Sequence, residues 1–278
     1  MKGLNTELKL ELLPERIILG GYRGSIAHGM YTKTYGPNAH DDKDLMGVFI
    51  GPDTHYFGFQ RTRSIATAHG RESDTRVEVM LAGEDGVIWD AVSYELRKYV
   101  SLLCKGNPNV LCLLWLPEHM YFHTSSLGQI LIANRHLFAT KKCYKSFVGY
   151  AHGQMVKAEH PKGKHMGAAR RELVDEFGFD PKHASHCIRI ARMGIEFLST
   201  GELTVERTDA NELLSIKRGE WSLERVKEEA ARLFAKAEDA LIHSPLPPKP
   251  DMPKIEALLM AMVEEGIQGF RAEEESHV

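Results

Sequence analysis

The pattern of apolar residues changes near Tyr94, and this change favours a sheet followed by helices. From Arg16 to about Val92, the apolar segments RIILGG, LMGVFI, RVEVML and GVIWDAV are short and partly β-branched, as in strands. Polar stretches such as ATAHGRESDT separate them. From Tyr94 onward, apolar residues recur at three- and four-residue spacing, which is typical of helices with one buried face. We therefore predict an α+β fold, in which a core domain with a small mixed β-sheet (residues 1–118) precedes a helical domain (residues 119–278).

Capping signals mark several of the expected helices. The helix that begins near Tyr94 is expected to stop at Gly106, because Asn107 and Pro108 follow. Asp180 and Pro181 have the properties of an N-cap and a first helical residue. SPLPPKPD is expected to be an extended connector. Further helices are predicted over residues 125–139, 142–159, 167–177, 181–200, 210–216, 222–243 and 253–266.

Composition restricts the class of protein. The 278 residues are 43% hydrophobic and 26% charged, which is ordinary for a globular chain with a sizeable core. No apolar run approaches the roughly 20 residues of a membrane span, and the N-terminal segment lacks the pattern of a signal peptide. The four cysteines form no C-x-x-C pair, which favours a reducing compartment. We expect a cytoplasmic protein that does not bind membranes. The sequence does not determine its oligomeric state.

Charge is spread unevenly along the chain. The net charge is −3, but residues 141–192 hold eleven Lys and Arg against five Asp and Glu. These charges could simply be solvated helix faces. If the protein binds an anionic ligand, however, the middle helices are the expected place. If that ligand is an RNA, its predicted contact is a basic cluster within these helices, whose members are Lys157, Lys162, Lys164, Arg170 and Arg171.

A glycine-serine turn follows the first predicted strand. The strand over residues 16–21 leads to Gly24 and Ser25. Backbone N–H groups in such a turn, together with the Ser25 hydroxyl, can cradle a phosphate. Glycine-rich turns are common, so the turn alone does not establish a phosphate site.

Spaced aspartates make the prediction more specific. Asp42 and Asp44 precede LMGVFI, and alternate residues of a strand face the same side. Two close carboxylates repel each other, and Mg²⁺ or Mn²⁺ between them would relieve the repulsion. Asp90, an acid within an apolar strand, is the preferred third ligand of a two-metal site, and Glu78 is the second choice. The alternative is that these acids belong to a surface loop and an edge strand.

The helix predicted from Pro181 carries a cationic face. Lys182, His186 and Arg189 are four and three residues apart, so they share one side and could clamp a triphosphate. The alternative is an ordinary basic surface stripe. Lys105 and Asn107 follow the first long helix, where they are candidates for contact with a base or ribose. For Asn107, helix capping is the alternative.

The order of these blocks resembles a known family. GYRGSIAHG, DDKDLMGV, DAVSYELRKY and KGNPNVL are similar to blocks of the RlaP-type predicted nucleotidyltransferases, within the DNA polymerase β superfamily. Later blocks, such as FGFDPKHASHCIRIARMGIEFLSTGE, extend the resemblance over most of residues 16–255. It implies a metal-bearing mixed sheet followed by a helical domain. It also implies that Gly24 and Ser25 bind phosphate and that Asp42, Asp44 and Asp90 bind metal.

Two classes of function remain. The leading one is an enzyme that transfers a nucleoside monophosphate from a nucleoside triphosphate (NTP), ATP for example, to a hydroxyl acceptor. The resemblance implies an association with RNA ligases, so the end of an RNA, such as a tRNA, is the expected acceptor. Protein nucleotidylation (AMPylation) would require the same three aspartates. The competing class is a non-catalytic module that binds nucleotide or RNA. The sequence does not identify the NTP or the pathway.

Overall fold

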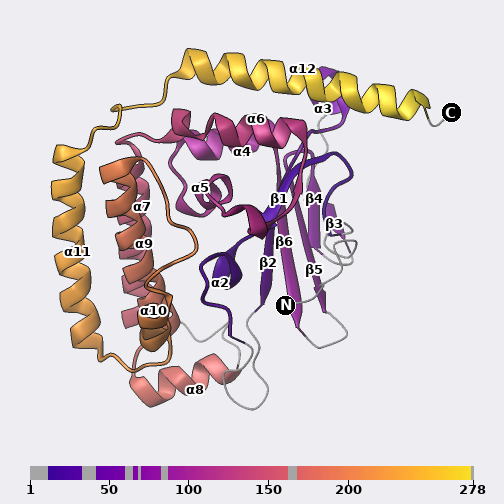
Figure 1. The fold of residues 1–278 in the computed structure, drawn as a ribbon. Coiled ribbons are helices and arrows are strands. Elements are labelled where there is room, and N and C mark those ends of the chain that lie inside the picture. Colours follow the sequence, from indigo (N-terminus) through magenta and orange to yellow (C-terminus); the bar gives the residue numbers. More distant parts are fainter. Residues whose placement is uncertain are drawn as a thin grey trace.

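A seven-stranded mixed sheet stands beside a group of helices (Figure 1). The computed structural model describes residues 12–32, 42–59, 65–67, 70–82, 87–161 and 168–276. The strands are ordered β3-β4-β5-β6-β2-β1-β7. Their bounds are β1 Ile17–Tyr22, β2 Lys43–Phe49, β3 Ile65–Thr67, β4 Gly70–Ser73, β5 Arg76–Ala82, β6 Ile88–Glu95 and β7 Tyr121–Thr124. The predicted α+β class is confirmed.

Helices occupy most of the remaining described chain. They are α2 Gly24–Ala27, α3 Asp53–Phe57, α4 Leu96–Cys104, α5 Pro108–Leu114, α6 Ser126–Ala133, α7 Cys143–Glu159, α8 Ala168–Phe177, α9 Pro181–Thr200, α10 Ala210–Lys217, α11 Leu223–His243 and α12 Met252–Ser276, with short 3₁₀ turns at Glu118–Met120 and Arg135–Phe138. α9 packs against α7, α10 and α11, and α12 crosses the top of the view and packs on α4 (Figure 1).

The two faces of the sheet bury different residues. Met46, Val48 and Val92 point into the large core shared with the helices. Leu45 and Trp89 belong to a smaller cluster on the opposite face. Because side chains alternate along a strand, each even-numbered residue of β2 faces the helices. This alternation sets the direction of the acidic residues at the start of the strand.

The capping predictions are confirmed. The side chain of Asp180 accepts a hydrogen bond from the backbone N–H of His183, and Pro181 is the first residue of α9. α4 ends at Cys104, and Gly106 then adopts a left-handed φ of 68°. The connector over residues 244–251 separates α11 from α12.

Several elements differ from the predictions. The polar stretch ATAHGRESDT contains most of β3 and all of β4, because β3 pairs with β4 and β4 pairs with β5 in a ladder near the sheet edge that needs little burial. α5 and β7 were not predicted, and α12 extends beyond the predicted residues 253–266. β7 lies past residue 118 yet pairs with β1, so the division between residues 118 and 119 stays a prediction. Within the described ranges, no helix has the length and apolar character needed to cross a membrane.

Candidate active site

Two carboxylates lie side by side where β2 and β6 begin. These strands are parallel, and Asp44 is the register partner of Asp90. Paired residues of neighbouring strands face the same side, so both side chains lie on the face that the helices cover. Asp42 precedes β2 by one residue and is exposed. The backbone pairing therefore forces two acids together at the edge of a buried core.

The Arg23 guanidinium bridges the two carboxylates. Its Nη2 lies 2.7 Å from Asp90 Oδ2 and 3.2 Å from Asp44 Oδ1. The Arg23 backbone N–H also donates to the Asp44 carbonyl. Its Nε atom is buried without a hydrogen-bond partner among the described residues. A positive charge thus occupies the place where two negative charges would otherwise repel each other.

The environment of Asp44 disfavours its negative charge. Burial raises the pKa of Asp44 to about 6, and the carboxylates of Asp90 and Asp42 act in the same direction. Arg23, and to a smaller extent Lys182, oppose this rise. Additional positive charge at this position would therefore stabilise the ionised carboxylate.

Gly24 brings the main chain against the Asp44 carboxylate. It opens the short helix α2 with a φ of +61°, so the predicted turn is in fact the start of a helical turn. A Cβ atom at this position would overlap the Asp44 carboxylate oxygen. Glycine is required here for both reasons. Ser25 follows, and it lines the same cavity.

One cavity of about 270 Å³ collects most of the predicted residues. It is bounded by α2, the start of β2, and helices α5, α7, α9 and α10. Its lining residues are Arg23, Gly24, Ser25, Ala27, His28, Met30, Asp42, Asp44, Asn109, Cys112, Tyr150, Lys182, His186, Arg189 and Lys217. Asp90 does not line the cavity itself and is joined to it through Arg23.

The cationic face of α9 forms one wall of this cavity. Lys182, His186 and Arg189 all line it, as their spacing predicted. Burial, together with the charges of Arg189 and Lys182, holds the pKa of His186 well below its ordinary value, so this imidazole is neutral. Arg189 is buried, and no carboxylate of the described residues lies within ion-pairing distance of it. A buried guanidinium without an acid favours an anionic ligand.

Three predicted residues lie elsewhere. The Asn107 side chain accepts hydrogen bonds from the backbone N–H groups of Asn109 and Val110, so it caps α5. Lys105 ends α4 and does not line the cavity, and its carbonyl accepts from Ser146. The structure supports the capping alternative for Asn107, and the contacts of Lys105 and Asn107 with a base or ribose stay a prediction. Glu78, the second choice for a metal ligand, pairs with Arg76 instead.

Several cavity residues were not predicted. Arg23, His28, Asn109, Tyr150 and Lys217 come from four separate parts of the chain. Arg23 and His28 flank the predicted glycine-serine turn, so their nearness to it was a usable signal. The other three reach the cavity only through the packing of α5, α7 and α10, which no local pattern encodes.

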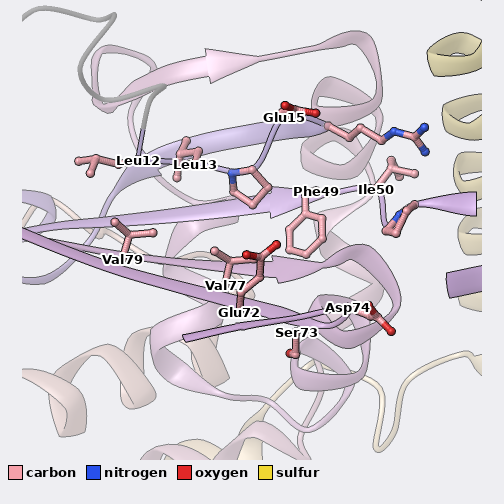
Figure 2. Close-up of a pocket in the computed structure, with 13 residues that line it drawn as sticks. Leu12, Leu13, Glu15, Phe49, Ile50, Glu72, Ser73, Asp74, Val77 and Val79 are labelled. Carbon is pink, nitrogen blue, oxygen red and sulfur yellow. The ribbon is translucent and has the colours of Figure 1, made fainter. Parts of the chain in front are cut away.

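A larger hollow of about 670 Å³ lies on the opposite face of the sheet (Figure 2). Leu12, Leu13, Val77 and Val79 give it an apolar floor, while acids such as Glu72 and Asp74 line it too. It contains none of the predicted site residues. Size alone does not make it the active site, because the paired acids and buried cations lie in the other cavity.

The donor set suits a divalent cation. Carboxylate oxygens are preferred ligands of Mg²⁺. The Arg23 bridge and the raised pKa of Asp44 both indicate that a cation is favoured between Asp44 and Asp90. Across the residues that the structure describes, no three His, Cys, Asp or Glu side chains are already gathered as a metal-binding group. The residues therefore fit a metal that displaces or joins Arg23, with Asp42, which lines the same cavity, as a further carboxylate.

The sheet, the glycine-serine turn and the strand-borne aspartates are the features on which the sequence resembles nucleotidyltransferases of the DNA polymerase β type. A family model described as "RNA repair pathway DNA polymerase beta family" matches residues 6–261. The chain belongs to this family.

Other comparisons add little to this assignment. No curated protein matches the chain. Among solved structures, the CD-NTase CdnG of Bradyrhizobium diazoefficiens, in complex with GTP, is 11% identical, with 95% of this chain and 90% of that chain covered. The TM-score of 0.22 is too low for an argument about fold or ligand.

Proposed function

We propose that the protein transfers a nucleoside monophosphate from an NTP to a hydroxyl acceptor. The acceptor oxygen attacks the α-phosphorus, the bond from that phosphorus to the bridging oxygen breaks, and pyrophosphate leaves. The observation that carries the proposal is the convergence of Asp42 and Asp44 with Lys182 and Arg189 on one cavity, with Asp90 beside Asp44. Carboxylates and cations so placed can serve the two ends of an Mg²⁺-bound triphosphate.

The proposed roles follow from position. Asp42, Asp44 and Asp90 would hold Mg²⁺ or Mn²⁺, which when bound activates the attacking hydroxyl and stabilises the leaving pyrophosphate. Gly24 and Ser25 line the cavity beside Asp44, where the Gly24 backbone and the Ser25 hydroxyl would hold a phosphate. Lys182 and Arg189 would bind the triphosphate tail, and the neutral His186 could donate or accept a hydrogen bond there.

An RNA end is the proposed acceptor. Lys145 and Lys157 on α7, and Lys142 at its N-cap, are exposed, and Tyr150 of the same helix lines the cavity. The acid of this helix, Glu159, is paired with Lys227. A basic face that adjoins the cavity suits a phosphodiester backbone. Of the predicted basic cluster, Lys157 and Arg171 are exposed. Lys162, Lys164 and the side chain of Arg170 lie outside what the structure describes.

Labelling tests the acceptor directly. The wild-type protein is incubated with each α-labelled NTP, Mg²⁺, total RNA and lysate protein. We expect the label on RNA in a ribonuclease-sensitive product. Label on protein would mean that the acceptor is a protein and the reaction is protein nucleotidylation. Tight NTP binding without any covalent label would favour a non-catalytic nucleotide-binding module.

A further inference from the structure

A buried histidine connects α2 to the cationic wall of the cavity. His28 follows α2 and is 5% exposed. Its Nδ1 lies 2.9 Å from the carbonyl oxygen of Val205. On the other side of the ring, Nε2 is hydrogen-bonded to Nη1 of Arg189, a residue 161 positions away in the sequence. The imidazole therefore bridges two distant parts of the chain.

The two partners define the protonation state of His28. A carbonyl oxygen can only accept, so Nδ1 must carry the proton. A guanidinium can only donate, so Nε2 must offer its lone pair. The ring is therefore the neutral Nδ1–H tautomer. Burial and the Arg189 charge agree with this, since both hold the pKa of His28 well below its ordinary value.

The bridge determines how Arg189 meets the cavity. Nη1 is occupied by His28 and by the Met193 sulfur. Nε and Nη2 make no hydrogen bond to the described part of the chain, although Arg189 lines the cavity. A guanidinium edge of this kind can bind two oxygens of one phosphate group. Because His28 holds Nη1, the edge formed by Nε and Nη2 is available for the ligand.

We propose that His28 is a positioning residue that orients Arg189 toward the phosphate tail of the NTP, by accepting a hydrogen bond from Nη1 as the neutral Nδ1–H tautomer. The proposal rests on the proposed function, because it takes Arg189 to be a phosphate ligand. His28 acts through Arg189, and the acceptor atom at its Nε2 is the feature that matters.

Binding measurements with matched variants test this role. His28→Gln can place an acceptor oxygen near the Nε2 position, whereas His28→Phe cannot. We expect His28→Phe to weaken NTP binding roughly tenfold or more, about the effect of one charge-assisted hydrogen bond, and to leave NMP binding unchanged. His28→Gln should restore most of the loss. In an Arg189→Ala background, His28→Phe should add little, because the group that it positions is gone.

The controls distinguish the positioning role of His28 from the phosphate-binding role of Arg189. If Arg189→Ala weakens NTP binding and His28→Phe does not, the positioning role is wrong and the triphosphate site survives. If Arg189→Ala leaves NTP binding unchanged, the phosphate role of Arg189 itself is wrong. Equal losses of NTP and NMP binding in His28→Phe, without recovery in His28→Gln, would mean that His28 serves only the fold.

A spectroscopic measurement keeps the proposal testable even if His28→Phe does not fold. ¹⁵N NMR of the wild-type protein without ligand reports which imidazole nitrogen carries the proton. His28 should show a protonated Nδ1 and an unprotonated Nε2, with no change between about pH 6 and 8. A proton on Nε2, or an imidazolium within this range, would overturn the proposal.

Discussion

At the scale of single residues, the central feature of the site is the charge of Asp44. Asp44 and Asp90 are brought together by strand pairing, and the Arg23 charge affects Asp44 more strongly than the Asp90 carboxylate does, but burial outweighs Arg23. Because the pKa of folded Asp44 is raised from 3.8 to about 6, the folded state holds the proton more tightly than the unfolded state. Folding stability therefore loses this contribution as pH rises from about 4 through 6.

Asp44→Asn should remove this pH-dependent loss of folding stability and abolish nucleotide transfer. In metal-free buffer at pH 7, we expect the free energy of unfolding to rise by about 1–2 kcal/mol, because a disfavoured charge is removed. Urea titration and the transfer assay measure the two effects. Glu78→Gln, a change to an acid on the same sheet that pairs with Arg76, is the matched control and should leave transfer intact. A destabilised Asp44→Asn protein would contradict the electrostatic explanation.

The buried imidazoles act in the opposite direction on the pH scale. Because burial depresses the pKa of His186 and His28 below 6.5, the unfolded chain binds protons there before the folded protein does. Their stabilising effect is complete above pH 6.5 and is lost as pH falls below it.

His186→Gln should therefore lose less stability on acidification than the wild type. The difference between the two free energies of unfolding should change by up to about 1.4 kcal/mol per pH unit below pH 6.5. Urea titrations from pH 5 to 7 measure it. A pH-independent difference for His186→Gln would show that this imidazole is not held neutral.

Individual site residues were predictable where a short pattern encodes them. The Asp42 and Asp44 spacing, the cationic face of α9 and the Gly24 turn are local patterns, and all of them reach one cavity. Arg23 was not predicted because its partners, Asp44 and Asp90, become neighbours only through the β2–β6 register. Asn107 was ambiguous because its side-chain amide can serve either as a helix cap or as a ligand contact, and the local sequence is the same in both cases.

At the scale of elements, α7 has an unusual surface. Gly149 and Gly153 lie in the middle of this 17-residue helix, both exposed, and an added Cβ would meet nothing within 4 Å among the described residues. Glycine weakens a helix interior by roughly 0.5–1 kcal/mol relative to alanine. Among the described residues, no close neighbour at either position requires glycine.

Replacing either glycine should stabilise the protein. We expect Gly149→Ala and Gly153→Ala each to raise the free energy of unfolding by about 0.5–1 kcal/mol. Gly194→Ala is the matched control on α9. Its Cβ would lie 2.9 Å from the Phe147 Cβ, so it should destabilise. Urea denaturation compares the three variants, and a loss of stability at Gly149 would show that its surroundings differ from those described.

Helices were predicted correctly where an amphipathic period coincides with capping residues at both ends. α9 begins and ends at the predicted residues because Asp180 and Pro181 open it and Gly201 closes it with a left-handed φ. β3, β4 and β7 were missed because strands at or next to the edge of a sheet need little apolar alternation. α5 was missed because its apolar run is continuous and short, which gives no helical period.

At the scale of the whole molecule, positive charge is concentrated on the middle helices although the net charge is −3. Binding of RNA through these helices would release counterions. Its affinity should therefore fall with salt, by about 0.7 log units per log unit of salt for each phosphate contact.

The triple variant Lys142→Gln, Lys145→Gln, Lys157→Gln should flatten that salt dependence and weaken RNA binding. NTP binding should be unchanged, because these three lysines do not line the cavity. A second triple variant changes Lys236, Lys249 and Lys254 to Gln. It alters the net charge equally in the acidic C-terminal part and should keep the wild-type slope. Titration at several salt concentrations measures both, and parallel slopes for all proteins would exclude α7 as the RNA-binding face.

The most direct test of nucleotide transfer uses NTP labelled separately at the α- and γ-phosphates. With Mg²⁺ and the acceptor identified by labelling, wild-type protein should place the α-label on the acceptor and release the γ-label in pyrophosphate. Asp44→Asn and Asp90→Asn should do neither. Transfer of the γ-label to the acceptor, or transfer of the α-label that persists in both variants, would contradict the account.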